Sequence, residues 1–514
     1  MPGRTDTLKP ALDRLAAENF SETGKAIEEI AASGASHAAD ILAALAERRL
    51  FVAAGGKAVF YTAAAGAAVD ARTALPLGVP PANAAAVRIN NRLRSAIEAA
   101  LGGLTLMSPD PARRIAAAEA VFRTRDTGKL QAIEAALARE RHAAALAALT
   151  AARAAILAVK ADAPNAARFE AIAALRARGD REALTILKSL PADTPPGLKT
   201  AAAQAATAIE DRLALWGAAQ NVWYGLSLGS VLLLAAIGLA ITFGVMGVFN
   251  MAHGEMVMLG AYTTYVVQES IRTSAPALFG YSLALSIPLA FLIAGLAGIA
   301  IERGIIRFLY GRPLETLLAT WGVSLILQQA VRTVFGATNR EVGAPEFMTG
   351  TFKIGELSIT WNRLWIVVLA GLVFAALLTT IRATSFGLQM RAVTQNRQMA
   401  GSMGIRTPWV DALTFGLGSG IAGLAGVALS QIDNVSPNLG QSYIVDSFLV
   451  VVFGGVGNLW GTLIAALSLG VANKLLEPYA GAVLGKILLL VLIVLFIQRR
   501  PRGLFALKGR AVEA

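Results

Sequence analysis

The chain has 514 residues, of which 55% are hydrophobic and 16% charged, with a formal net charge of +12 and no cysteine. The missing cysteine excludes disulfides, thiolate metal sites and cysteine catalysis. Much of the positive excess lies in short loops beside apolar segments, where Lys and Arg set membrane topology, so nucleic-acid binding is not expected.

Residues 1–200 are rich in Ala, Arg, Glu and Asp, and they are expected to form a helical domain. Asp110 and Pro111 have the pattern of an N-cap followed by proline at the first helical position. Further helices are expected over about 127–140, 142–159, 166–178 and 181–190. Successive helix pairs of this kind favour an α-solenoid of the HEAT type. The single histidines His37 and His142 are interpreted as surface or core residues.

One segment, residues 50–62, departs from the helical pattern. Its β-branched and aromatic residues flank Gly55 and Gly56, which predicts a small hairpin. The proline-rich stretch 191–197 predicts a linker. An amphipathic linker helix over 201–221 is then expected to lead into the first apolar segment.

Residues 222–514 are expected to form a polytopic bundle of membrane helices. Roughly 20 residues per full span, with shorter broken spans allowed, give about nine hydrophobic elements. These elements are 222–243, 250–269, 282–301, 314–335, 364–381, 409–430, 444–455, 459–475 and 479–498. The fold class expected for the whole chain is therefore all-α. Close helix packing is predicted by the small residues Gly416, Gly418, Ser419, Gly420, Gly423 and Gly426.

The basic residues predict the orientation of these helices. Positive loops stay in the cytoplasm, which places there the loop with Arg303, the loop 382–406 and the C-terminal tail from Arg499. The segments 336–363 and 431–443 then lie on the opposite side. An odd number of spans puts residues 1–200 outside the cytoplasm. Residues 1–30 show no apolar h-region of a signal peptide. Either the chain is therefore a mature or truncated form, or one element is re-entrant and the N-terminal domain is cytoplasmic.

The first candidate site lies in the apolar stretch between Phe243 and Tyr262. Asn250, His253 and Glu255 interrupt this stretch, and such groups are costly in a membrane unless they face protein or a watery path. His253 is the only histidine of the membrane half, which excludes a multi-histidine metal site there. No enzyme activity, metal or cofactor is expected, so the polar cluster is a candidate transport site.

Nucleotide hydrolysis is also not expected in this chain. Gly481-Ala-Val-Leu-Gly-Lys486 is one residue too short for a phosphate loop, and Gly455 to Gly461 has the wrong spacing for a dinucleotide loop. If the protein pumps a solute, another subunit therefore hydrolyses the nucleotide. The basic loop 382–405 is the candidate contact with that subunit, and an ordinary topology loop is the equal alternative.

Three motifs occur in one order in the membrane half. They are Asn250-Met-Ala-His-Gly-Glu255 with Gly260-Ala-Tyr262, Arg391-Ala-Val-Thr-Gln-Asn-Arg-Gln-Met-Ala400 with Gly404-Ile405, and Val452-Phe-Gly-Gly-Val-Gly-Asn-Leu-Trp-Gly461. Together they resemble the permease family of branched-chain amino-acid ABC importers over about residues 220–510. Within the family, segments 317–329, 339–343 and 430–440, and the extra N-terminal domain, look most like urea permeases.

The resemblance implies a multi-pass permease of the bacterial inner membrane. Its expected partners are a second related permease, cytoplasmic ABC ATPase subunits, a periplasmic solute-binding protein and membrane lipid. Residues 382–406 then look like the loop that couples to an ATPase. The coupling residues expected from the match are Met390, Arg391, Ala392, Gln395, Asn396, Ala400, Gly404 and Ile405.

The solute expected from the resemblance is small, uncharged and polar, with urea first and branched-chain amino acids as the alternative. A membrane scaffold that recruits partners through the solenoid is the alternative of another class. A neutral solute needs a path of hydrogen-bonding groups. The path candidates are Asn250, His253, Glu255, Thr320, Trp321 and Asn458. Capping of broken helices with bonding to backbone is an equally weighted alternative for five of them. For Glu255 the alternative is a pair with a basic residue or stabilisation of a helix start.

Overall fold

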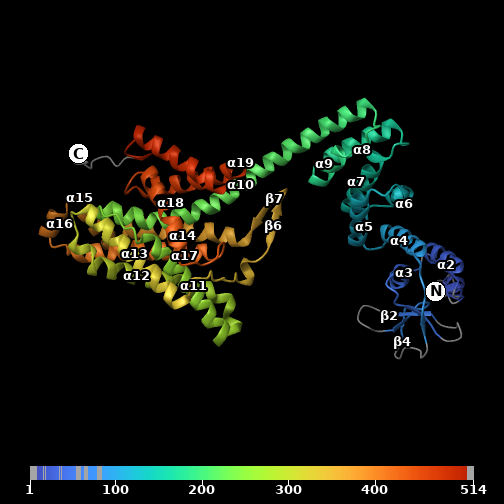
Figure 1. Ribbon diagram of the computed structural model, residues 1–514, viewed down its shortest axis with the longest axis horizontal. Helices are drawn as coiled ribbons and strands as arrows, with labels where there is room; N and C mark the ends of the chain where they lie inside the picture. Colours follow the sequence, from blue (N-terminus) through green and yellow to red (C-terminus); the bar gives the residue numbers. More distant parts are fainter. Residues whose placement is uncertain are drawn as a thin grey trace. The chain divides into compact units, whose positions relative to one another are not determined.

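The computed structural model describes residues 8–15, 17, 19–33, 35, 37–53, 59–62, 68–77 and 84–505 (Figure 1). The chain divides into two compact units, Met1–Ala214 and Leu215–Ala514. Helices dominate the described part of both units. We call the second one the membrane unit.

The N-terminal unit contains two apolar cores, one among the elements up to α4 and one among those that follow. Its helices are α1 (Lys9–Leu15), α2 (Phe20–Ala32), α3 (Ala38–Ala46), α4 (Asn91–Leu106), α5 (Pro111–Thr124), η1 (Thr127–Lys129), α6 (Leu130–Leu137), α7 (Ala143–Val159), α8 (Asn165–Arg178) and α9 (Arg181–Lys188). The predicted cap of α5 is confirmed, because Asp110 Oδ1 accepts a hydrogen bond from Ala112 N at 2.9 Å.

A five-stranded antiparallel sheet lies between α3 and α4 in sequence. Its strands are β1 (Leu50–Val52), β2 (Val59–Thr62), β3 (Ala68–Asp70), β4 (Pro76–Leu77) and β5 (Ala85–Ala86), in the order β4-β3-β2-β1-β5. The strands β1 and β2 pair within the segment expected as a hairpin, whose central Gly55 and Gly56 lie outside the described residues.

The all-α prediction is therefore wrong for the N-terminal unit, and the HEAT-like solenoid is not supported there. Leu50, Val59 and Tyr61 of the sheet join the core with α2, α3 and α4. A solenoid would bury these helices against the next repeat, whereas here a sheet contributes to the same core.

A buried ion pair connects α5 with the start of α7. Arg114 donates from Nε to Glu140 Oε2 at 2.6 Å, and Glu140 Oε1 also accepts from the backbone N–H of His142 at 2.8 Å. The side chain of Glu140 is only 3% exposed. The hydrogen bond from Arg114, with that from His142, lowers the pKa of Glu140 from 4.5 to about 2.

The N-terminal unit is therefore expected to lose stability in acid through Glu140. A lowered folded-state pKa contributes stability in full above 4.5, and this is lost as the pH falls through about 2. The Glu140→Gln protein should unfold at a lower temperature than the wild type at pH 7, and this difference in melting temperature should be smaller at pH 3. The exposed carboxylate Glu134, which pairs with Arg153, gives the control Glu134→Gln. If the difference in melting temperature between Glu140→Gln and the wild type is as large at pH 3 as at pH 7, Glu140 is not the source of the acid sensitivity.

The membrane unit begins within the long helix α10 (Pro196–Met246), which also includes the predicted linker helix. The other helices are α11 (His253–Ser274), η2 (Pro276–Tyr281), α12 (Ser282–Gly304), η3 (Ile306–Phe308), α13 (Pro313–Phe335), η4 (Glu346–Met348), α14 (Trp361–Ala383), α15 (Ser385–Gln395), α16 (Arg397–Ser402), α17 (Thr407–Leu429), α18 (Leu439–Gly454) and α19 (Leu459–Arg499). A two-stranded sheet of β6 (Thr351–Ile354) and β7 (Leu357–Thr360) is a second departure from an all-α fold.

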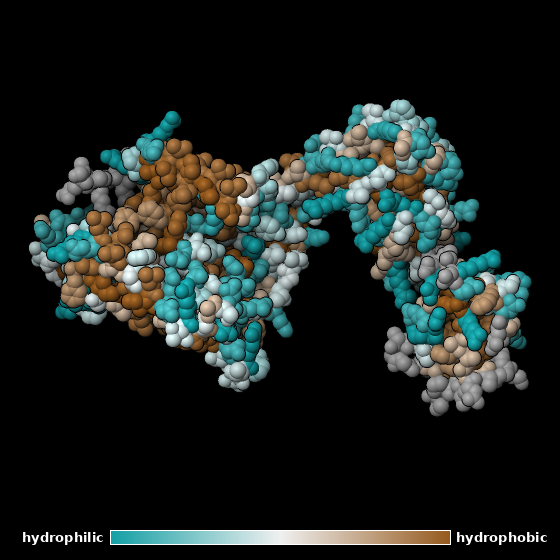
Figure 2. All heavy atoms as spheres, in the orientation of Figure 1, coloured by the Kyte–Doolittle hydropathy of each residue, from teal (hydrophilic) through white to brown (hydrophobic). Residues whose placement is uncertain are grey.

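In the described part of the chain, 5 helical segments are long and apolar enough to cross a membrane. They are Pro196–Met246, Pro276–Phe308, Trp361–Ala383, Thr407–Leu429 and Leu459–Arg499. Each hydrophobic element predicted from the sequence overlaps a helix. The last two both lie in α19, which is kinked at Gly481 (φ 76°), near the start of the last predicted element. Figure 2 shows hydrophobic side chains over the region of α18 and α19, where Val483 and Leu484 are exposed.

The helix α17 packs closely against three others through its small residues. A Cβ on Gly260 of α11 would lie 2.0 Å from Gly423 O, and a Cβ on Gly238 of α10 would lie 2.2 Å from Gly418 O. One on Gly298 of α12 would lie 2.2 Å from the side chain of Ser419. The predicted close packing of this helix is confirmed.

Loops that the charge pattern assigns to the same side contact one another. Arg340 and Val435 form an antiparallel bridge between the segments 336–363 and 431–443. Gln268 Nε2 donates to Gly343 O at 2.8 Å. Near the other helix ends, Leu504 N of the basic tail donates to Phe453 O at 2.9 Å. The bridge between Arg340 and Val435 therefore joins two segments that the charge pattern places on the same side.

Candidate functional site

The helices α11 and α13 run side by side in the same direction, joined by polar contacts. Near the start of α11, Met251 N donates to Thr320 Oγ1 at 3.1 Å. One turn further, Glu255 Oε1 accepts from Ser324 Oγ at 2.9 Å and from Gln328 Nε2 at 2.8 Å. We call Glu255, Thr320, Ser324 and Gln328 the polar seam.

One face of α13 supplies three residues of the polar seam. Thr316, Thr320, Ser324 and Gln328 follow at intervals of four, and each is at most 5% exposed. Residues four apart lie on the same helical face, so they form one buried polar stripe. The opposite face exposes large apolar side chains such as Ile326, at 69%. A membrane helix with this division turns its polar face towards protein.

Glu255 is the one carboxylate of the polar seam, and it is 1% exposed. Its Oε1 holds both hydrogen bonds, whereas Oε2 has no hydrogen-bond partner among the described residues. A buried carboxylate oxygen without a donor is costly. Oε2 of Glu255 is therefore an acceptor that the described residues leave unused.

Asn250 and His253 have other contacts at the start of α11. Asn250 Oδ1 accepts from Ala252 N at 3.0 Å. His253 Nε2 donates to Ala235 O of α10 at 2.8 Å. A Cβ on Gly238 would lie 2.7 Å from His253 Cε1, so this glycine makes room for the ring. The predicted cluster is thus divided, with His253 against α10 and Glu255 against α13.

Two path candidates lie outside the polar seam. Trp321 is 47% exposed although its neighbour Thr320 is completely buried. Asn458 caps α19, since its Oδ1 accepts from Gly461 N at 3.1 Å. Sequence reasoning missed Ser324 and Gln328, although the spacing of four from Thr316 would have indicated them.

The predicted coupling residues lie on α15, on α16 and in the turn after them. Met390 and Ala400 are buried, Ala392 is half-buried, and Arg391, Gln395 and Asn396 are exposed. Asn396 Oδ1 caps α16 by accepting from Met399 N at 2.9 Å. Gly404 takes a φ of +89°, and Ile405 N then donates to Ala400 O at 3.1 Å. The segment is therefore a pair of short helices, and a turn at Gly404 leads from it to α17.

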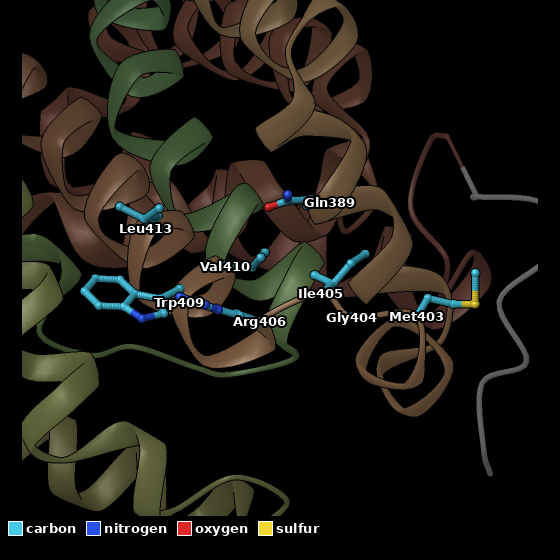
Figure 3. A pocket seen from close by; sticks show the side chains of 8 residues that line it. All are labelled: Gln389, Met403, Gly404, Ile405, Arg406, Trp409, Val410 and Leu413. Carbon is cyan, nitrogen blue, oxygen red and sulfur yellow. The ribbon is translucent and has the colours of Figure 1, made fainter.

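An open cavity of about 610 Å³ lies between this segment and the start of α17. Its lining residues are Gln389, Met403, Gly404, Ile405, Arg406, Trp409, Val410 and Leu413. In Figure 3 the labelled side chains extend from Trp409 through Arg406 and Ile405 to Met403. Met403 is 78% exposed and Met399 is 61% exposed. Exposed flexible methionines suit a surface that adapts to a protein partner.

Comparisons with known proteins identify the membrane unit. The family described as "branched-chain amino acid transport system / permease component" matches residues 221–497. The high-affinity branched-chain amino acid transport system permease protein LivH of Escherichia coli (strain K12) is 31% identical over 292 residues, which cover 55% of this chain and 94% of LivH. The corresponding permease protein BraD of Pseudomonas aeruginosa is 30% identical over 296 residues, again 55% of this chain and 94% of BraD.

A more distant relative is the ribose import permease protein RbsC of Escherichia coli (strain K12), which is 24% identical over 263 residues, 49% of this chain and 77% of RbsC. No solved structure matches the chain. The family match covers more than half of this chain, and the alignments with LivH and BraD cover almost the full length of those two proteins. The chain belongs to the branched-chain amino acid transport permease family, and it is a non-catalytic permease component of an ABC transport system.

Proposed function

We propose that this permease carries a small nitrogen-bearing solute past the polar seam, and that branched-chain amino acids are the first candidates. The single observation that carries the proposal is the unpartnered Oε2 of the buried Glu255. A carboxylate in this position can accept hydrogen bonds from the ammonium group of an amino acid. The transport named for LivH and BraD supports the same solute class.

Urea is the second candidate, and two observations favour it. Apart from Glu255, the polar seam offers hydroxyl and amide groups, which match the N–H donors and the carbonyl of urea. In addition, the alignments with LivH and BraD cover only 55% of this chain, so the N-terminal unit lies beyond the matched permease region. An extra N-terminal domain is one of the features in which the sequence resembles urea permeases.

Competition between the two solutes tests the proposal. Cells that depend on this permease take up labelled leucine or labelled urea in the presence of an excess of either unlabelled compound. If leucine is the solute, unlabelled leucine abolishes labelled leucine uptake and urea does not. The reverse pattern would establish the second candidate, and failure to transport either would overturn both.

We further propose that the N-terminal unit lies outside the cytoplasm. Gln220 of α10 exchanges two hydrogen bonds with the backbone of Ser358 in β7, with N–O distances of 3.0 and 2.8 Å. The segment around β7 belongs to the side opposite the basic loops. Added protease should therefore cut the N-terminal unit in intact spheroplasts. Protection there, with cleavage after lysis, would place this unit in the cytoplasm.

The proposed assembly also contains a second permease, cytoplasmic ATPases and a solute-binding protein outside the cell. The family membership and the exposed methionines near α16 support an ATPase on residues 382–406. ATP-driven closure of the ATPases would then move one group of membrane helices against another.

A further inference from the structure

A buried carboxylate of α17 receives its counter-charge from α16. Asp411 is 0% exposed, and Arg397 Nη1 donates to its Oδ1 at 3.2 Å, with a second contact from Nη2 to Oδ2. Two parallel hydrogen bonds of this kind fix the relative orientation of the groups as well as neutralising their charges. The position of α16 is therefore tied to that of α17 at one point.

The same guanidinium contacts the loop before α13. The carbon Cζ of Arg397 lies 4.6 Å from the centre of the Tyr310 ring. Burial, with Asp411 and Glu302 nearby, raises the pKa of Tyr310. Its hydroxyl donates to Glu302 Oε1 of α12 at 3.1 Å. Arg397 thus contacts α17 directly, and it reaches α12 through Tyr310.

The helix α17 continues this connection to the polar seam. A Cβ on Gly426 would lie 2.0 Å from Val257 O of α11, so the two helices are in backbone contact two residues after Glu255. With no space between the two backbones, α17 cannot move towards α11 without displacing it. A displacement of α17 therefore reaches the helix that carries Glu255.

We infer that Arg397 is a positioning residue that transmits movement of α16 to α17 and to the loop before α13, and so couples ATP use to solute movement. The inference rests on the proposed function, since it requires an ATPase on residues 382–406. The movement of α16 is then transmitted by the ion pair between Arg397 and Asp411 and by the contact of Arg397 with the Tyr310 ring, and not by α15 and α16 as a whole.

The neutral double variant Arg397→Gln with Asp411→Asn tests the inference. Replacing both partners avoids leaving an unpaired buried charge, which is the main cost of a single replacement. The complete complex with its ATPases is reconstituted in liposomes, and ATP hydrolysis and uptake of labelled leucine and labelled urea are measured in the same vesicles. The ratio of solute taken up to ATP hydrolysed is expected to fall about tenfold, a usual size for a coupling effect.

The matched control is the ion pair Lys474 and Glu477, which is partly exposed and lies on α19, outside the connection from Arg397 to α17 and α13. The double variant Lys474→Gln with Glu477→Gln should keep the wild-type ratio. A second test variant, Arg397→Lys, keeps the charge and loses the planar stacking, so it should lower the ratio in the same direction.

Three outcomes would overturn the inference. An unchanged ratio in both Arg397 variants would show that the contact transmits nothing. Loss of ATPase association in these variants would make Arg397 part of the docking surface instead. Wild-type vesicles that hydrolyse ATP without taking up either solute would contradict the proposed function, and the inference would fail with it.

Discussion

Replacing Gly426 by alanine is expected to prevent most of the membrane unit from folding stably. The added Cβ would lie 2.0 Å from Val257 O and 2.7 Å from Ala261 N, both backbone atoms of α11. Neither atom can move without displacing the helix that carries Glu255. Adding atoms to a well-packed core lowers the free energy of unfolding by about 1–3 kcal/mol, occasionally more. We expect a loss at the upper end of this range for Gly426→Ala, because the added Cβ meets backbone atoms.

Gly322 of α13 gives the matched control, because a Cβ there has no atom within 4 Å. Gly322→Ala should leave stability unchanged or raise it by about 0.5–1 kcal/mol, since alanine favours a helix over glycine. Both proteins are solubilised, heated in steps and analysed by size-exclusion chromatography to obtain the midpoint of loss of the folded peak. Equal midpoints for the two variants would mean that α11 and α17 are not in backbone contact.

The contrast between Gly426 and Gly322 indicates what the sequence can predict about the membrane unit. Long apolar runs identify helices because membrane helices satisfy their own backbone hydrogen bonds. Small residues at regular spacing identified α17 as a closely packed helix, and its contacts confirm this. The partner of each glycine was not predictable, because it depends on how distant helices meet in space.

The N-terminal sheet was largely missed for a different reason. The strands have 2 to 4 residues each, and β5 consists of Ala85 and Ala86, which carry no strand signal. Only β1 and β2, with Phe51 and Phe60 in cross-strand register, are rich in aromatic and β-branched residues. Short alanine-rich strands are fixed by their neighbours, so the sequence showed the hairpin and not the sheet.

The candidate site was predicted in part. Glu255 could be identified from the sequence because burying a carboxylate in a membrane costs free energy, whichever residues contact it. Its donors Ser324 and Gln328 lie about 70 residues further along the chain and were found only in the structure. Trp321 was assigned to the path with Thr320, whereas consecutive helical residues point about 100° apart. The structure accordingly buries Thr320 and exposes Trp321.

Replacing Glu255 by glutamine is expected to abolish most solute uptake while the complex stays assembled. Glutamine keeps the size of the side chain, and its carbonyl can still accept from Ser324 and Gln328. Its amide group would replace the unpartnered Oε2 and present N–H donors to the solute. Loss of a hydrogen bond to a charged group costs about 1.5–3 kcal/mol, which corresponds to roughly 10-fold to 150-fold weaker interaction with an ammonium group.

Uptake of both candidate solutes by this variant separates the roles open to Glu255. The control Glu269→Gln changes a carboxylate of the same helix that is 51% exposed and lies 3.8 Å from Arg272, so uptake should stay at the wild-type level. An uncharged solute such as urea should lose less than an amino acid in Glu255→Gln, towards the tenfold end of that range, because only one partner of its hydrogen bond to Glu255 is charged. If Glu255→Gln transports both solutes like Glu269→Gln, Glu255 serves to hold α11 against α13, and the polar seam is not the path.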